Sequence, residues 1–285
     1  MHRYRTAGLA AFFALSMMPA LAAVQSERVQ FQNGPKDDPP TLNGVLYRPA
    51  GAGPFPAIVA LHGCSGLWSS KDATNVSPRD ADWAEVLVRD GFVVLFPDSY
   101  GSRGLGPQCT NSDRDVSPSR ERVADARAAR AYLQTLPFVK PDAIALMGWS
   151  NGGSTVLYAV RPRDVPKDGK PDFRMAVAFY PGCRDPIKNG KWQTRMPLHI
   201  LIGQSDNWTP AAPCQELASG AGSIVTLTTY PGAYHDFDNA EQKLHALHGL
   251  AFTADGSGNA MSGLNPAARA DAFIRVPGFF ALLKE

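Results

Sequence analysis

The stretch that decides the fold is residues 143–153, which read AIALMGWSNGG. Its first five residues form an apolar run typical of a strand that is buried on both faces. Gly148, Ser150 and Gly152 follow in a G-x-S-x-G pattern, and a stretch compatible with a helix comes next. A strand, a tight turn and a helix in this order raise the serine above the strand end, where the helix N-terminus favours negative charge. We therefore expect Ser150 to be a nucleophile rather than an idle residue in a glycine-rich turn.

Outward from this stretch, strand and helix patterns alternate along the chain. Strands are predicted at 29–32, 44–47, 57–61, 92–96, 175–180, 198–202 and 225–230, and helices at 80–89, 117–136, 151–160 and 267–274. We expect Ser117 or Ser119 to cap the second helix, and Pro277 to bend the last one or to start a second piece. This alternation predicts an α/β fold in which helices flank a mostly parallel sheet. Residues 254–264 are rich in Gly, Ser and Asn and predict a surface loop rather than a linker, so we expect a single domain.

A serine nucleophile requires a base and an acid that orients the base. In this type of fold the three follow in the order serine, acid, histidine. Asp206 comes just after the strand predicted at 198–202, and His235 just after the strand at 225–230. The carboxyl ends of parallel strands meet at one edge of the sheet, so we expect Ser150, Asp206 and His235 to form a triad there. Asp98, which follows an earlier strand, is the second-choice acid.

A loop rich in glycine follows the strand predicted at 57–61 and reads HGCSG. Gly63 and Gly66 allow its backbone amides to turn inward. We expect the N–H groups of Cys64 and Asn151 to form an oxyanion hole, with an ordinary turn as the alternative for the loop. Among the other histidines, His62 is expected to be a loop residue and His199 a packed core residue.

The first 22 residues have the features of a cleaved signal peptide. Two arginines, Arg3 and Arg5, precede an apolar run over 7–18 that is too short to span a bilayer, and small residues follow at 20 and 22. We expect cleavage after Ala22 or one residue later, export to the periplasm or the medium, and one catalytic domain over 23–285. The alternatives are an N-terminal membrane anchor and a buried helix.

The composition excludes several classes of protein. Apolar residues make up 44% of the 285 residues and charged residues 19%, a balance that disordered chains lack. The net charge of +2 comes from 28 basic and 26 acidic residues, and the two arginines of the signal peptide account for it. We find no basic cluster interleaved with aromatic residues and no further apolar run of membrane-spanning length. We therefore expect neither a nucleic-acid partner nor a membrane span.

The chain has four cysteines, an even number that in an exported protein favours disulfides. Three pairings are possible. We favour Cys64–Cys109 and Cys183–Cys214, because each of these pairs joins two loops at the carboxyl ends of predicted strands. A metal site is the alternative, but the CxxC and HxxxH spacings that would support it are absent.

Five segments together resemble the dienelactone hydrolase family of α/β-hydrolases. They are HGCSG (62–66), PDSYGSRG (97–104), GWSNGG (148–153), GQSDNWTP (203–210) and YPGAYHDFD (230–238). The resemblance extends from about residue 28 to the end of the chain. It implies an eight-stranded, mostly parallel sheet, a triad of Ser150, Asp206 and His235, and oxyanion amides at Cys64 and Asn151. The founding enzymes are cytoplasmic and carry cysteine as the nucleophile. Ser150 and the features of export therefore favour ordinary esters over dienelactone.

The surroundings of the predicted triad bear on the substrate. The segment between Tyr180 and Leu198 is too short for a large cap domain, so we expect an open, shallow site. Its expected borders are Trp149, Trp208, Tyr234 and the loop over 101–109, and the alternative is that Trp149 and Trp208 pack beneath the loops. Arg103 lies near this site, where it could bind a carboxylate or fix a loop.

These features predict a serine hydrolase that cleaves carboxylic esters or lactones of small molecules through an acyl-enzyme on Ser150. The chemistry requires no metal and no cofactor. Two alternatives remain open: an amidase or peptidase with the same triad, and a non-catalytic binding protein on a hydrolase scaffold. The sequence does not determine the oligomeric state.

Overall fold

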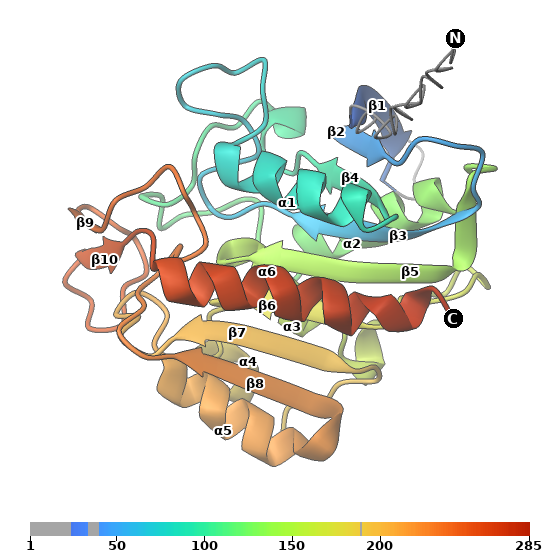
Figure 1. The fold of residues 1–285 in the computed structure, drawn as a ribbon. Helices are drawn as coiled ribbons and strands as arrows, with labels where there is room; N and C mark the ends of the chain where they lie inside the picture. Colours follow the sequence, from blue (N-terminus) through green and yellow to red (C-terminus); the bar gives the residue numbers. More distant parts are fainter. Residues whose placement is uncertain (1–23, 34–39, 189) are drawn as a thin grey trace, which may run out of the picture.

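The computed structural model describes residues 24–33, 40–188 and 190–285, so the signal peptide expected over 1–22 lies outside the described residues. An eight-stranded sheet runs through the molecule in the order β1-β2-β4-β3-β5-β6-β7-β8 (Figure 1). Its strands are β1 (Gln25–Gln32), β2 (Thr41–Arg48), β3 (Phe55–Leu61), β4 (Val93–Pro97), β5 (Val139–Trp149), β6 (Ala176–Phe179), β7 (Leu198–Gly203) and β8 (Val225–Tyr230). β1 and β2 form the antiparallel edge, and the other six strands are parallel. The predicted α/β class and mostly parallel sheet are confirmed.

Apolar runs place the central strands in the core. Every residue of β4, β6 and β7 is buried, as is β5 from Ala143 onward. The helices that cover the sheet are α1 (Pro78–Arg89), α2 (Glu121–Leu133), α3 (Asn151–Ala159), α4 (Arg184–Ile187), α5 (Ala211–Ala221) and α6 (Pro266–Phe280). Figure 1 shows α1 and α6 in front of the sheet and α3 behind it. Cover on both faces leaves the strand ends as the accessible part of the sheet.

Two expected helix boundaries are wrong. Helix α2 begins at Glu121, and neither Ser117 nor Ser119 caps it; instead the Glu121 carboxylate accepts a hydrogen bond from the Ser117 amide at 2.8 Å. Helix α6 continues through Pro277. Val276 and Phe280 on either side of the proline are fully buried, and their burial offsets the backbone hydrogen bond that proline cannot make.

Residues 254–264 are not simply a surface loop. They contain β10 (Ala260–Ser262), which pairs antiparallel with β9 (His245–Leu247). A bridge between His235 and Ser262 and a hydrogen bond from the Gly263 amide to the His235 carbonyl at 2.9 Å attach this hairpin to the loop after β8. Figure 1 places the hairpin beside the carboxyl ends of the strands.

Across the described ranges, no helix is both long and apolar enough to cross a lipid bilayer.

Candidate active site

The turn between β5 and α3 presents Ser150. The residue has φ 52°, a left-handed backbone that is uncommon outside glycine and asparagine. Glycine is required on both sides of it. A Cβ at 148 would overlap the backbone of Gly152, and a Cβ at 152 would overlap the Leu61 carbonyl oxygen of β3. The G-x-S-x-G pattern thus reflects a close approach of three backbone segments that lifts the serine hydroxyl above the sheet.

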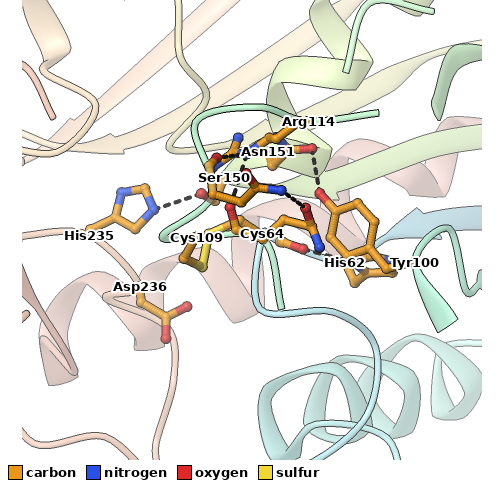
Figure 2. Close-up of a disulfide and its surroundings, with 12 residues drawn as sticks. His62, Cys64, Tyr100, Cys109, Arg114, Ser150, Asn151, His235 and Asp236 are labelled. Carbon is orange, nitrogen blue, oxygen red and sulfur yellow. Dashed lines mark hydrogen bonds between the residues drawn. A yellow bond between two sulfur atoms is a disulfide. The ribbon is translucent and has the colours of Figure 1, made fainter. Parts of the chain in front are cut away.

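Ser150, His235 and Asp206 are joined in one hydrogen-bonded chain. Ser150 Oγ lies 2.9 Å from His235 Nε2, and His235 Nδ1 lies 2.8 Å from Asp206 Oδ2. Figure 2 shows His235 directed at the Ser150 hydroxyl. The three residues come from the ends of β5, β7 and β8, where the sequence places them. Asp206 and His235 are 4% and 3% exposed, so little solvent competes for the bond between them.

Asp206 is held as an acceptor by its own loop. Its Oδ1 accepts hydrogen bonds from the backbone amides of Trp208 and Thr209, both at 2.9 Å. The Thr209 hydroxyl lies 3.0 Å from Asp206 Oδ2 and 3.1 Å from His235 Nδ1. Donors thus surround both carboxylate oxygens of Asp206 and hold them in place beside His235 Nδ1, while His235 Nε2 faces the serine.

The other candidate acid, Asp98, and the histidines His62 and His199 lie outside this hydrogen-bonded chain of side chains. Asp98 accepts hydrogen bonds from the Trp68 indole at 2.7 Å and the Gly101 amide at 2.8 Å, so it holds a loop. His62 is fully buried, and burial together with the Arg122 charge holds its pKa well below the usual value. His199 lies 2.9 Å from the Thr228 hydroxyl, and burial lowers its pKa to about 4.

The two expected oxyanion donors border the same space as Ser150. In the described part of the chain, the backbone amides of Cys64 and Asn151 donate no hydrogen bond to another residue. Both residues line the pocket beside Ser150. A Cβ at 63 would lie at ordinary contact distance from Trp149 and Ser150, so this loop packs directly against the turn that presents Ser150. Amides without a partner beside a serine hydroxyl are compatible with an oxyanion hole.

Arg122 connects the two segments that carry these amides, a role that the sequence analysis missed. Its guanidinium donates to the Asn151 side-chain oxygen at 2.6 Å and to the His62 carbonyl at 2.7 Å. The Tyr100 hydroxyl donates to the same Asn151 oxygen at 3.2 Å. Figure 2 shows Tyr100 and Asn151 in this contact beside the disulfide. The only sequence signal was an arginine on the apolar face of a helix, which is compatible with many partners.

Both favoured cysteine pairs are disulfides in the structure. Cys64 is bonded to Cys109, and Cys183 to Cys214, with Cα–Cα separations of 4.9 and 5.1 Å. The first disulfide ties the loop with the Cys64 amide to the loop after β4. The second ties the loop after β6 to α5, which begins shortly after Asp206. No cysteine is left free to act as a rival nucleophile.

A pocket of about 620 Å³ opens above Ser150. Four chain segments line it around the floor residues Ser150, Asn151 and Ser154: residues 112–118, 182–185, 208–213 and 251–254. Trp208 forms part of the wall, and its ring centroid lies 4.6 Å from that of His235. The wall over 251–254 is fastened at both ends, by the Ala251 amide to the Cys109 carbonyl at 3.0 Å and by Arg184 to the Ala254 carbonyl at 3.1 Å.

Some expected borders of the pocket are wrong. Trp149 is fully buried and lies outside the pocket lining, so it packs beneath the loops. Tyr234 is half-buried and also outside the lining, and residues 112–118 form the wall that was expected from 101–109. Arg103 pairs with Asp125 at 2.7 Å and donates to the Ser99 carbonyl at 2.6 Å, so it fixes a loop.

A second polar cluster lies on the core side of the His235 loop. It contains Arg79 of α1, Tyr180 after β6, and Asp236 and Asp238 of the loop itself. Arg79 forms an ion pair with Asp236 at 2.8 Å. The Tyr180 hydroxyl lies 3.0 Å from Asp236 Oδ1 and 2.7 Å from Asp238 Oδ1. Burial raises the pKa of Asp238 and, well above its usual value, that of Tyr180. Asp236 has a lowered pKa, because Arg79 and Asn239 favour its ionised form against the effect of burial.

The described residues contain no group of three or more His, Cys, Asp or Glu side chains placed to hold a metal ion.

Comparisons with known proteins identify relatives in sequence and in fold. A putative carboxymethylenebutenolidase of Synechocystis sp. is 24% identical over 216 residues, which are 69% of this chain and 81% of that protein. Two solved structures share the fold. One is a dienelactone hydrolase-like promiscuous phosphotriesterase from metagenomic libraries, with 17% identity, 92% and 99% of the two chains covered and a TM-score of 0.63. The other is the propionate-bound esterase 2 of Thermogutta terrifontis, with 21% identity, 94% and 96% covered and a TM-score of 0.61.

The family model of the dienelactone hydrolases matches residues 42–283, which include every residue of the Ser150–His235–Asp206 chain. The protein belongs to the dienelactone hydrolase family.

Proposed function

We propose that this protein is a serine hydrolase that cleaves carboxylic esters or lactones of small molecules. One observation carries the proposal: the hydrogen-bonded chain from Asp206 through His235 ends at Ser150, on the floor of an open pocket. Membership of a hydrolase family and the similarity in fold to an esterase support the same reaction class.

In the proposed mechanism His235 Nε2 accepts the proton of the Ser150 hydroxyl as Ser150 Oγ attacks the ester carbonyl carbon. The amides of Cys64 and Asn151 donate hydrogen bonds to the tetrahedral oxyanion. When the bond between the carbonyl carbon and the alkoxy oxygen breaks, His235 donates the proton to the leaving alcohol. Water then attacks the acyl-enzyme with His235 again as base, which releases the acid and restores Ser150. Asp206 orients His235 and stabilises its charged form.

The pocket favours a small substrate. Its volume of about 620 Å³ lies within the range of sites for small organic molecules. Aromatic surface at Trp208 and Phe252 provides an apolar side for an acyl or aryl group. A lactone fits the same chemistry, because ring opening leaves the alcohol and the acyl group in one molecule.

A panel of p-nitrophenyl esters of increasing acyl length, together with lactones and p-nitroanilides, tests the reaction class. We expect ester turnover by the wild type and a decrease in kcat/KM of at least about 10⁴-fold in Ser150→Ala. Ser223→Ala is the matched control, because Ser223 is an exposed serine on the turn before β8 and should leave turnover unchanged. Turnover of anilides without esters would assign the protein to the amidases. Ester turnover that persists in Ser150→Ala would contradict the mechanism.

We also propose that the chain is exported and acts as one catalytic domain over 23–285 in the periplasm or the medium. Two disulfides and no free cysteine support this, because such bonds persist in oxidising compartments. N-terminal sequencing of the mature protein should begin at residue 23 or 24. Recovery of the protein only from the cytoplasm, with four reduced thiols in a non-reducing peptide map, would contradict export.

A further inference from the structure

The strand that ends in the nucleophile and the loop that carries the histidine are joined twice. On the pocket side, Ser150 Oγ lies 2.9 Å from His235 Nε2. On the core side, the residue before the nucleophile, Trp149, donates its indole N–H to Asp238 Oδ2 at 3.0 Å. Asp238 is three residues after His235. The same two segments are therefore connected by two side-chain contacts, one beside the pocket and one in the core.

Asp238 has hydrogen-bond partners on two further elements. The indole of Trp83 in α1 donates to the same Oδ2 atom at 2.7 Å. The hydroxyl of Tyr180, after β6, contacts Oδ1 at 2.7 Å. Asp238 and the two tryptophans are 0% exposed, and none of them lines the pocket. Burying a carboxylate costs free energy unless the group is hydrogen-bonded or protonated. The three partners of Asp238 supply these hydrogen bonds, and together they fix the position of the loop that carries it.

Backbone strain gathers at the same place. In the part of the chain that the structure describes, the non-glycine residues with positive φ are Ser150 at 52°, Tyr180 at 35° and Asp236 at 58°. Strained residues persist where surrounding contacts over-determine them, and they concentrate at functional sites. Tyr180 and Asp236 contact each other at 3.0 Å, and Figure 2 shows the Asp236 carboxylate directed away from Ser150. The strain is thus held by contacts on the core side.

The number of protons in the cluster agrees with a neutral Asp238. The Tyr180 hydroxyl has a single proton, but its oxygen lies within hydrogen-bond distance of two carboxyl oxygens, 2.7 Å from Asp238 Oδ1 and 3.0 Å from Asp236 Oδ1. Asp236 is paired with Arg79 and also accepts from Asn239 at 2.8 Å, so it stays ionised and accepts from Tyr180. A proton on Asp238 Oδ1 would then be donated to the tyrosine oxygen, and an asparagine at 238 can form the same set of hydrogen bonds.

We propose that Asp238 is a positioning residue for the reaction, which holds the nucleophile turn and the histidine loop in register through Trp149. This inference rests on the proposed function. It assigns Asp238 to the alignment of Ser150 with His235 and not to contact with the substrate.

The test compares two pairs of variants with p-nitrophenyl acetate as substrate and a fluorophosphonate as the serine probe. Asp238→Leu should lower kcat and the labelling rate at least about tenfold while KM stays within about twofold, and Asp238→Asn should keep both rates within about threefold of wild type.

Trp149→Phe and Trp83→Phe each remove one indole donor from the same oxygen, Asp238 Oδ2. We expect about a tenfold decrease in both rates for Trp149→Phe and at most a threefold decrease for Trp83→Phe, with similar decreases in Tm.

The outcomes separate this inference from the proposed function. Equal decreases in kcat for the two tryptophan variants would show that the bonds to Asp238 only stabilise the core, and would overturn the inference. So would an Asp238→Leu enzyme with wild-type kcat. If the wild type reacts with the fluorophosphonate but hydrolyses no ester, the proposed function fails, and the labelling rates still test the positioning role. If Asp238→Leu does not fold, the tryptophan pair decides.

Discussion

Two polar clusters share the loop after β8, one on each side of His235. The pocket-side cluster contains Ser150, Asp206 and His235, and its Ser150 lines a pocket of about 620 Å³. The core-side cluster contains Arg79, Tyr180, Asp236 and Asp238, and none of these residues lines that pocket. Both clusters are built from buried carboxylates and short hydrogen bonds. Burial and short bonds alone therefore do not identify a catalytic group.

What separates the clusters is the partner of each carboxylate. Asp206 faces a histidine, whose charge can change during a reaction, and a space for substrate lies beyond it. Asp236 faces an arginine, whose charge is permanent, and Asp238 faces two indoles and a phenol. A carboxylate beside a histidine can assist proton transfer, because the histidine accepts and releases protons. A carboxyl group whose partners keep their charge throughout can only hold the segments that carry them in place.

The largest expected effect contrasts the two carboxylates by the same substitution. Asp206→Asn should lower kcat by about 10³- to 10⁴-fold, because the amide favours the wrong histidine tautomer. Asp238→Asn should stay within about threefold of wild type. Steady-state kinetics with p-nitrophenyl acetate measure both. Similar losses in the two variants would mean that the core-side cluster also takes part in proton transfer.

The disulfides give an intermediate effect on the pocket side. The bonds close segments with sequence separations of 45 and 31 residues, so each double alanine variant should lose a similar ~4 kcal/mol of unfolding free energy. Cys64→Ala with Cys109→Ala should also lower kcat at least tenfold, because the loop with the Cys64 amide is no longer tied. Cys183→Ala with Cys214→Ala should act mainly on KM. Urea titration and kinetics separate the two effects, and a kcat loss that is equal in both variants would refute the assignment.

The smallest effect concerns stability and pH on the core side. Burial, opposed by Arg79 and reinforced by the charge of Asp236, raises the pKa of Asp238 in the folded protein. A carboxyl group with a raised pKa holds its proton more tightly when folded, so its contribution to stability is present at low pH and is lost as the pH rises through the folded pKa. We expect Asp238→Asn to gain stability relative to wild type between pH 4 and pH 8. Urea unfolding at several pH values measures the difference, and a constant difference would argue against a raised pKa.

The parts of the fold that could be predicted are those set by local pattern. The central strands are short apolar runs buried on both faces, and such runs are visible without tertiary information. Ser150, Asp206 and His235 each come directly after one of these runs, so their meeting at one edge of the sheet follows from parallel topology. The disulfide partners follow from the same reasoning about strand ends.

The parts that could not be predicted depend on contacts between distant segments. The Trp149 indole turns into the core to donate to Asp238. This contact could not be predicted, because Asp238 lies 89 positions away in the chain. The guanidinium of Arg122 has acceptors on His62, Ser99 and Asn151, from three separate segments. The hairpin of β9 and β10 has strands of only three residues, too short to show the alternation of apolar and polar residues that marks a strand.

The pocket wall over 251–254 has a consequence for how this protein could be changed. Each residue of the Ser150–His235–Asp206 chain lies earlier in the sequence, and α6, which returns to the core, begins only at Pro266. Residues can therefore be inserted into or removed from this wall without altering the spacing of the nucleophile, acid and histidine along the chain. We therefore expect changes to this segment, which is anchored at its ends by Cys109 and Arg184, to act on the size of the pocket more than on the contact between Ser150 and His235.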